Sequence, residues 1–293
     1  MANKVLIIGA TGLLGSVLYK KFQISEQVVG TYFRPRTNIN KKLIFLDATD
    51  PKQLSGLVRD LLPSTIINCM GLASVEMCEL RPEASWKLNT EIPLRLAQIS
   101  SQLGIRLIHF STDHYKSEKD QPRKESDSVV AINQYGNSKL QAERIIREHD
   151  TSALILRTNF FGRSRYERKS LLDFALMALE SKNRIVGFED VFFSPMGAHE
   201  IANFLLDKSS NSIQGTLNLA SRQVISKFDF LTLVARIQGK DEANVFRGSI
   251  ANSDLSVVRP KYLALNPSLM IHETGYEVPT IEKMLRTEIY ETP

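Results

Sequence analysis

The sequence has little cysteine, no long hydrophobic run and only a small excess of positive charge. Its two cysteines are Cys69 and Cys78, and because Cys69 closes an apolar run typical of a strand, we expect a buried thiol and no disulfide framework. No apolar stretch approaches the ~18 residues that a membrane-spanning helix needs. The first four residues lead directly into an apolar run, so we expect no signal peptide and predict a cytoplasmic protein without membrane contact.

The charged residues argue against two further classes of protein. A net charge of +5 on 293 residues is too dilute to indicate nucleic-acid binding, although it suits small anionic ligands. None of the five histidines has the spacing of metal ligands, so we predict no required metal.

With 43% hydrophobic and 24% charged residues, the composition is that of an ordinary globular protein. The length allows one large domain, or a domain with a smaller lobe.

A glycine-rich stretch near the N-terminus carries the first positive signal. Residues 5–8 form a short continuous apolar run, as expected for a strand that is buried on both faces. Gly9, Gly12 and Gly15 follow at intervals of three, and residues 16–22 have helical spacing. Strand, glycine loop and helix indicate a dinucleotide-binding unit whose helix N-terminus attracts phosphates. An ordinary strand–turn–helix connection is the alternative interpretation.

The end of the second predicted strand bears on the choice of cofactor. Residues 27–32 form this strand, and where NAD enzymes often place an acidic residue the chain has Arg34 and Arg36. A guanidinium group suits the 2′-phosphate of NADP. We therefore predict NADPH as the cofactor, with NADH still possible. The alternative is that both arginines belong to a solvated loop.

Strands and helices alternate along the first half of the chain, which predicts an α/β protein with a Rossmann-type, doubly wound parallel sheet. The further predicted strands are residues 43–46, 65–69, 106–111 and 153–157, and the predicted helices include 51–62, 86–104 and 134–149. We assign residues 1–160 to an NADP-binding Rossmann domain, to which a strand near residues 215–220 should return. Residues 161–214 and 221–293 are assigned to a smaller, interleaved, mixed α/β lobe that binds the substrate.

A tyrosine and a lysine on one predicted helix are suited to acid catalysis. Tyr135 and Lys139 lie four residues apart, and therefore on one face. A lysine ~5 Å from a phenolate, at an effective dielectric near ~20, favours the anion by roughly 3 kcal/mol, which would lower a phenol pKa from about 10 towards 8. Such a phenol can protonate a carbonyl oxygen that receives a hydride. Tyr115 and Lys119 have the same spacing, but the charged segment 113–131 lacks helical periodicity, so we expect a mobile loop there.

Two other groups of polar residues could assist this chemistry. Ser111, Thr112 and Asp113 follow the strand at 106–111, where a hydroxyl could donate to the same carbonyl oxygen. An ordinary strand terminator is the alternative interpretation. Asn89 could hold a water or fix Lys139 by a hydrogen bond, and it could equally be a helix cap.

Assembled in this order, the residues resemble the extended short-chain dehydrogenase/reductases, and within them the dTDP-4-dehydrorhamnose reductase family. The resemblance runs nearly end to end. It rests on the glycine loop 9–15, Asp47, residues 67–71, residues 75–79 with Pro82, residues 88–89, 111–113, 135–139 and 156–158, and late in the chain on residues 194–195 and 259–260.

The resemblance implies roles for the matched residues. Tyr135 would donate the proton, Lys139 would bind the nicotinamide ribose, and Thr112 would hydrogen-bond the substrate carbonyl; these three are the expected catalytic residues. The residues expected to contact the cofactor are Gly9, Thr11, Gly12, Leu13, Leu14, Gly15, Arg34, Asp47, Ala48, Cys69, Met70, Gly71, Asn89, Ser111, Tyr135 and Lys139. Those expected to contact the substrate are Ser74, Thr112, Asp113, Asn159, Arg163 and Arg259. Arg259, or the arginines of the 163–168 loop, would meet its diphosphate.

The chain departs from this family directly after Asp113. The family usually continues Tyr-Val-Phe-Asp-Gly, whereas this chain reads His114-Tyr115-Lys116-Ser117-Glu118. Because the corresponding loop borders the sugar site in the family, the departure bears on substrate identity. His114 could relay a proton, although a solvated loop histidine is the simpler interpretation.

The resemblance implies NADPH-dependent reduction of a 4-keto nucleotide sugar, of the kind used in dTDP-rhamnose and polysaccharide biosynthesis. The nucleotide sugar would be the substrate, and a homodimer is a possible assembly. Two alternatives stay open. A nucleotide-sugar epimerase or dehydratase would keep its cofactor bound, and a non-catalytic NADP-binding regulatory subunit, similar to that of methionine adenosyltransferase, would bind without reacting.

Overall fold

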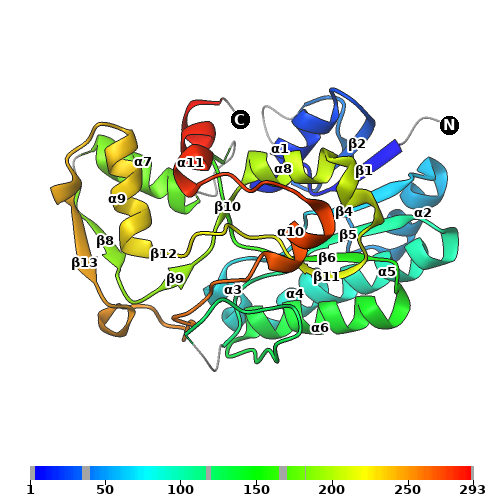
Figure 1. The fold of residues 1–293 in the computed structure, drawn as a ribbon. Helices are drawn as coiled ribbons and strands as arrows, with labels where there is room; N and C mark the ends of the chain where they lie inside the picture. Colours follow the sequence, from blue (N-terminus) through cyan, green and yellow to red (C-terminus); the bar gives the residue numbers. More distant parts are fainter. Residues whose placement is uncertain (1–3, 35–39, 117–119, 165–169, 182, 292–293) are drawn as a thin grey trace.

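A computed structural model describes residues 4–34, 40–116, 120–164, 170–181 and 183–291. Within these residues the central sheet has seven parallel strands in the order β11-β6-β5-β4-β1-β2-β3 (Figure 1). The strands are β1 (Lys4–Ile8), β2 (Gln27–Tyr32), β3 (Ile44–Phe45), β4 (Thr65–Asn68), β5 (Arg106–Phe110), β6 (Leu154–Arg157) and β11 (Gly215–Asn218). The first six follow the strand order of a doubly wound dinucleotide-binding sheet. The predicted fold class is therefore confirmed.

Alternate side chains of β1 enter two hydrophobic cores, one on each face of the sheet. Val5 and Ile7 pack in the core that contains α1 (Leu13–Phe22) and α8 (Ala198–Leu206). Leu6 and Ile8 enter the other core, with side chains from α2 (Pro51–Leu61), α5 (Ile92–Leu103) and α6 (Gln134–His149). Full burial of each such side chain contributes about 1.5–3 kcal/mol. The sheet is thus held rigidly between two helical layers.

Side-chain caps begin several of the helices, including α2 and α9. The carboxylate of Asp50 accepts the backbone N–H of Lys52 at 2.8 Å and so begins α2, with Pro51 as its first residue. Ser226 caps α9 (Lys227–Ile237) by accepting the N–H of Asp229 at 2.9 Å. Each cap contributes typically about 1 kcal/mol. None of the helices within the described ranges is both long enough and apolar enough to cross a membrane.

The second part of the chain is a set of short paired strands and helices beside the sheet (Figure 1). Its strand pairs are β7 (Phe160–Phe161) with β10 (Met196–Gly197), β8 (Ile185–Phe188) with β13 (Val245–Gly248), and β9 (Phe192–Phe193) with β12 (Ile225–Ser226). Besides α8 and α9, its helices are α7 (Leu171–Glu180), α10 (Ser268–Thr274) and α11 (Ile281–Tyr290), with short helical turns at Lys208–Ser212, Glu242–Asn244 and Ile250–Asn252.

The chain crosses between the two parts more than once. β11 pairs in parallel with β6, from Gly215 opposite Leu154 to Asn218 opposite Arg157, at the position where a returning strand was expected. Helix α8, which falls in the predicted substrate lobe, packs in the same core as α1. The division into residues 1–160, 161–214 and 221–293 stays a prediction, because α8 belongs to the range 161–214 but packs with α1 of the range 1–160.

Candidate active site

The glycine loop after β1 is held in a conformation that only glycine adopts readily. Gly9 has a φ of +84°, and its N–H donates to the hydroxyl of Thr31 on β2 at 3.2 Å. A Cβ at Gly15 would clash with the carbonyl oxygen of Gly9 and lie 2.9 Å from its carbonyl carbon. Helix α1 therefore packs directly on the loop, with Gly12 at its N-cap position.

A cavity of about 460 Å³ lies beside this loop. It lies at the carboxyl ends of the parallel strands β1 and β4, where the strand order of the sheet reverses, the place where doubly wound sheets bind ligands. The first turn of α1 borders it, so backbone N–H groups and the positive end of the helix dipole are available for a pyrophosphate. The predicted cofactor residues that line it are Thr11, Gly12, Leu13, Leu14, Cys69, Met70, Gly71, Asn89, Ser111, Tyr135 and Lys139. This set of groups fits a dinucleotide, and we call this space the first cavity.

The other predicted cofactor residues lie farther along the same edge of the sheet. Arg34 is exposed just after β2, while Arg36 falls outside the described residues. Asp47 accepts the hydroxyl of Thr49 at 2.6 Å in the turn before α2, and Ala48 beside it is buried. Cys69 is only partly buried, contrary to expectation, because it lies one residue beyond β4 in the wall of the first cavity.

Lys139 is buried and belongs to a chain of polar contacts that the sequence did not reveal. Its Nζ donates to the carbonyl oxygen of Phe110 and lies 3.3 Å from Nε2 of His109. Nδ1 of His109 lies 3.1 Å from Nδ2 of Asn68, so three neighbouring elements are connected. Burial lowers the pKa of Lys139 to about 8, and burial together with the Lys139 charge holds the pKa of His109 well below its usual value. At pH 7 the lysine is therefore mostly charged and the histidine neutral.

Asn89 holds the segment after β4 and not Lys139 itself. It lies in a π-helical turn, Lys87–Glu91, between α4 (Pro82–Trp86) and α5. Its amide accepts the N–H of Leu72 at 2.7 Å and donates to the carbonyl of Leu72 at 2.9 Å and to the hydroxyl of Ser138 at 3.0 Å. The side chain of Asn89 therefore connects the segment after β4 to α6. π turns of this kind often occur at functional sites.

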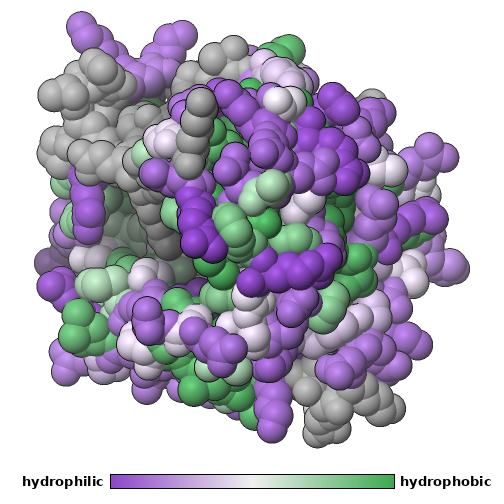
Figure 2. Space-filling model, turned by 90° about the vertical axis from the view of Figure 1, so that its left-hand side faces the viewer, coloured by the Kyte–Doolittle hydropathy of each residue, from purple (hydrophilic) through white to green (hydrophobic). Residues whose placement is uncertain are grey.

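A second cavity, also of about 460 Å³, adjoins the first. Tyr135 and Ser111 line both spaces. The wall on the sheet side comes from the ends of β5 and β6, and the opposite wall comes from the second part of the chain. Lining residues that bear on the chemistry are Thr112, Asp113, His114, Asn159, Lys227 and Arg259. Figure 2 shows the face formed by this second part, where hydrophobic groups interrupt a mainly hydrophilic surface.

Charged groups in the second cavity are perturbed by burial. Burial raises the pKa of Asp113 to about 6, against the opposing effect of Asn159, which donates to its carboxylate at 2.8 Å. Burial lowers the pKa of Lys227 to about 8, and its Nζ lies 3.3 Å from the ring centroid of Phe193. Arg259 forms an ion pair with Glu76. The cavity therefore combines two cations with one carboxyl group that titrates near neutral pH.

His114 and Tyr115 are not in a mobile, solvated loop, so that prediction was wrong for both. His114 is partly buried with its ring in edge contact with Tyr135, at 5.6 Å between centroids. Burial, with the charge of Arg259 second, lowers the pKa of His114 to about 4. Tyr115 is 0% exposed. Lys119, the partner in its four-residue spacing, lies outside the described residues.

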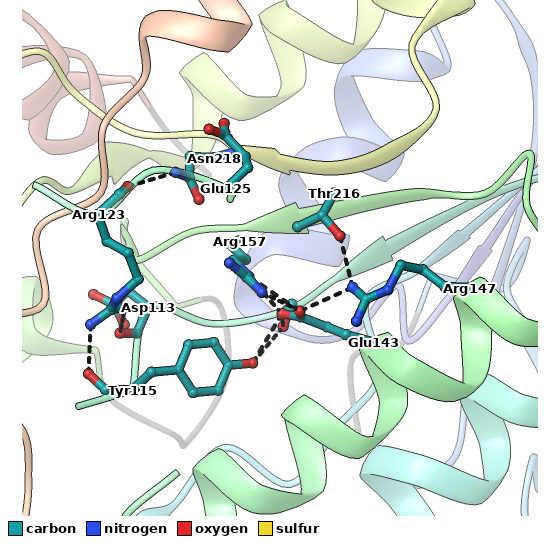
Figure 3. A network of polar contacts seen from close by, with 10 residues as sticks. Asp113, Tyr115, Arg123, Glu125, Glu143, Arg147, Arg157, Thr216 and Asn218 are labelled. Carbon is teal, nitrogen blue, oxygen red and sulfur yellow. Dashed lines mark hydrogen bonds and ion pairs between the residues drawn. The ribbon is translucent and has the colours of Figure 1, made fainter. Parts of the chain in front are cut away.

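Tyr115 is buried because it belongs to a polar network that crosses three elements (Figure 3). Its hydroxyl donates to Glu143 at 2.9 Å, and Glu143 lies on the same face of α6 as Lys139. Arg157 of β6 donates to the other Glu143 oxygen at 2.7 Å. Arg123 donates to the backbone carbonyl of Tyr115 at 2.8 Å, so the hydroxyl and the main chain of Tyr115 are both held by hydrogen bonds.

Two predicted substrate residues lie elsewhere. Ser74 caps α3 (Val75–Leu80) by accepting the N–H of Met77 at 3.2 Å, and its neighbours Ala73 and Val75 line the second cavity instead. Arg163 is exposed beside a separate hollow, and residues 165–169 of its loop fall outside the described ranges. Within the ranges described, no three histidine, cysteine or acidic side chains gather as metal ligands would.

The strand order, the glycine loop and the Tyr135–Lys139 pair beside the first cavity define a class of protein. They are the features of the extended short-chain dehydrogenase/reductases, which are NAD(P)-dependent oxidoreductases. The chain belongs to the RmlD substrate binding domain family, whose match spans residues 3–292. The predicted dTDP-4-dehydrorhamnose reductase family, and the prediction of an oxidoreductase, are thereby confirmed.

Three known proteins show what this chain is similar to. The probable low-salt glycan biosynthesis reductase Agl14 of Haloferax volcanii is 29% identical over 281 residues, which cover 94% of each protein. Methionine adenosyltransferase 2 subunit beta of Rattus norvegicus is 32% identical over 157 residues, which cover 53% of this chain and 46% of the subunit. The crystal structure of dTDP-4-dehydrorhamnose reductase from Bacillus anthracis in complex with NADP has a TM-score of 0.88, covers 100% of both chains and is 23% identical.

Proposed function

We propose that this protein uses NADPH to reduce the keto group of a 4-keto nucleotide sugar. The observation that carries the proposal is the position of Tyr135, which lines both cavities at once. A proton donor in a shared wall can reach a substrate carbonyl in one cavity while a reduced nicotinamide lies in the other. The Bacillus anthracis relative, crystallised with NADP, supports this choice of cofactor.

The proposed mechanism assigns one task to each polar group around the carbonyl. NADPH, when bound, supplies the hydride to the carbonyl carbon. Tyr135 donates its hydroxyl proton to the carbonyl oxygen, and the charged Lys139, one helical turn away, stabilises the phenolate that results. The Thr112 hydroxyl oxygen accepts the N–H of His114 at 3.1 Å, which leaves its own hydrogen to donate to the same carbonyl oxygen.

A nucleotide-linked sugar suits the second cavity better than a small free ketone does. The cavity is large, partly apolar and contains the cations Lys227 and Arg259, which suit a diphosphate. Binding energy from the nucleotide would be used at the reacting carbon, so the free sugar should react slowly. Two relatives support this substrate class, the probable low-salt glycan biosynthesis reductase of Haloferax volcanii and a dTDP-4-dehydrorhamnose reductase of Salmonella typhimurium.

Two further proposals concern the setting of the reaction. A reducing compartment such as the cytoplasm suits the free thiols of Cys69 and Cys78. A homodimer stays a prediction. The second candidate function is a non-catalytic, NADP-binding regulatory subunit, which the 32% identity to the methionine adenosyltransferase subunit favours.

The test follows NADPH oxidation with a 4-keto-6-deoxy nucleotide sugar. Tyr135→Phe should lower kcat by about 10² to 10⁴, the usual effect of losing a positioned acid, while the Kd for NADPH changes little. Tyr290→Phe, which removes a hydroxyl from the mostly exposed α11 tyrosine, is the matched control and should leave kcat unchanged. Tight NADPH binding by a wild-type protein that reduces no nucleotide sugar would refute the reductase and support the regulatory subunit.

A further inference from the structure

His114 is a polar group in the second cavity wall that the proposed reaction does not use through its side chain. Its ring lines the cavity and contacts Tyr135 edge to face. Its Nε2 atom is buried, and among the described residues nothing forms a hydrogen bond with it. A buried ring nitrogen without a partner costs free energy, so its position calls for a ligand atom.

The backbone around His114 is fixed on both sides, so the ring has a defined place. The hydroxyl of Thr112 accepts the N–H of His114. The carbonyl oxygen of His114 lies so close to Gly136 that a Cβ there would come within 2.8 Å of it. The next residue, Tyr115, is buried and hydrogen-bonded to Glu143 at 2.9 Å. The segment therefore packs directly against the first turn of α6, which also carries Tyr135. A ring placed in this way can discriminate between ligands.

We infer that His114 is a specificity-determining residue whose Nε2 forms a hydrogen bond with the sugar hydroxyl on the carbon next to the reacting carbonyl. The inference rests on the proposed function, because it is the proposed role of Tyr135 that places the carbonyl beside this ring. A neutral imidazole and a hydroxyl each offer a donor or an acceptor, so they can pair in either tautomer.

The chemistry of the substrate identifies the hydroxyl. In a 4-keto-6-deoxy sugar the carbonyl carbon has two neighbours, and one of them carries a methyl group and the ring oxygen. The other carries the 3-hydroxyl, which is therefore the group within reach of a side chain packed on the proton donor. A site built to bind a hydroxyl discriminates strongly against a substrate that lacks it, because its own buried polar group stays unpaired.

The experiment compares kcat/KM for a 4-keto-6-deoxy nucleotide sugar and for its 3-deoxy analogue. The wild type should prefer the hydroxylated substrate by roughly 10- to 100-fold. His114→Phe keeps an aromatic ring without a polar atom and should reduce this preference to within about 3-fold. His114→Gln, whose amide reaches a position similar to that of Nε2, should retain part of it. Thermal unfolding of each variant checks that the fold is kept.

The outcomes separate this inference from the proposed function. A wild type that reduces neither sugar overturns both. A wild type that reduces both sugars equally well overturns the role of His114 alone, and so does a folded His114→Phe variant that keeps the full preference. If His114→Phe does not fold, a folded His114→Gln variant with less than a tenth of the wild-type preference also overturns the inference, because the amide should replace the lost hydrogen bond.

Discussion

Replacing Glu143 tests whether the buried polar network beneath the site stabilises the fold. Glu143 is 0% exposed and Arg157 is 4% exposed, and the closest contact between them is 2.7 Å. Glu143→Gln keeps the shape of the side chain but leaves the Arg157 guanidinium buried without its counter-charge. Removing one partner of such a pair costs about 3–5 kcal/mol of unfolding free energy. For a protein of this size the melting temperature should fall by on the order of 10 °C.

Three further variants measure how much each partner of Glu143 contributes to the free energy of unfolding. Tyr115→Phe removes one hydrogen bond to a charged acceptor and should cost about 1.5–3 kcal/mol. Arg147→Ala removes a half-exposed partner of Glu143, with the charges 3.5 Å apart, and should cost at most about 1 kcal/mol. The double variant Glu143→Leu with Arg157→Met replaces the pair with apolar groups and should recover much of the loss.

Chemical unfolding followed by circular dichroism at pH 7 measures these differences. Burial alone would raise the pKa of Glu143, but the hydrogen bonds and charge of Arg157 outweigh it and hold the pKa below its usual value. A lowered carboxyl pKa stabilises the fold above the unfolded pKa, and the contribution is lost as the pH falls through the folded value. The reasoning fails if Glu143→Gln is no more destabilising than Arg147→Ala.

Two other predictions concern charge. Arg34→Ala should weaken NADPH binding by roughly 1.5–3 kcal/mol and NADH binding much less, because its guanidinium is assigned to the 2′-phosphate; fluorescence titrations that show equal losses would contradict this. Asp113 has a folded pKa of about 6, so between its unfolded pKa of about 3.9 and pH 6 the folded state binds the extra proton, and stability falls as the pH rises. Asp113→Asn should therefore increase the free energy of unfolding at pH 7 by up to about 3 kcal/mol and raise the melting temperature, and this advantage should disappear near pH 4. An equal gain at both pH values would exclude titration of Asp113 as the cause.

Local signals were enough to predict the sheet and the first cavity. The glycines at 9, 12 and 15 act within one loop, and the apolar runs of central strands such as β1 and β4 reflect burial on both faces. The Tyr135–Lys139 spacing needs only the helix on which both residues lie. These features depend on neighbours within a few residues, so the sequence contains them directly.

The residues that were missed depend on distant partners. His109 lies in an apolar strand pattern, and only the packing of α6 on β5 brings Lys139 to its ring. The 113–131 segment has no periodicity, and among its described residues several polar groups are satisfied by partners far away in the chain. The carbonyl of Arg123, for example, accepts from Asn218 at 2.8 Å and from the N–H of Asn266 at 2.8 Å. A pattern read along the chain cannot show that such a loop is fastened.

The late return of β11 to the sheet has a consequence for synthesis of the protein on the ribosome. β6 gains its outer neighbour only when residues 215–218 emerge, roughly 60 residues after β6 itself. At ~5–20 residues per second, β6 therefore waits ~3–12 s as the unpaired edge of an otherwise nearly complete sheet. An apolar edge strand in that state is a template for pairing with another chain. The interval between these two strands is thus a stage of synthesis at which the nascent protein exposes an apolar edge strand open to such pairing.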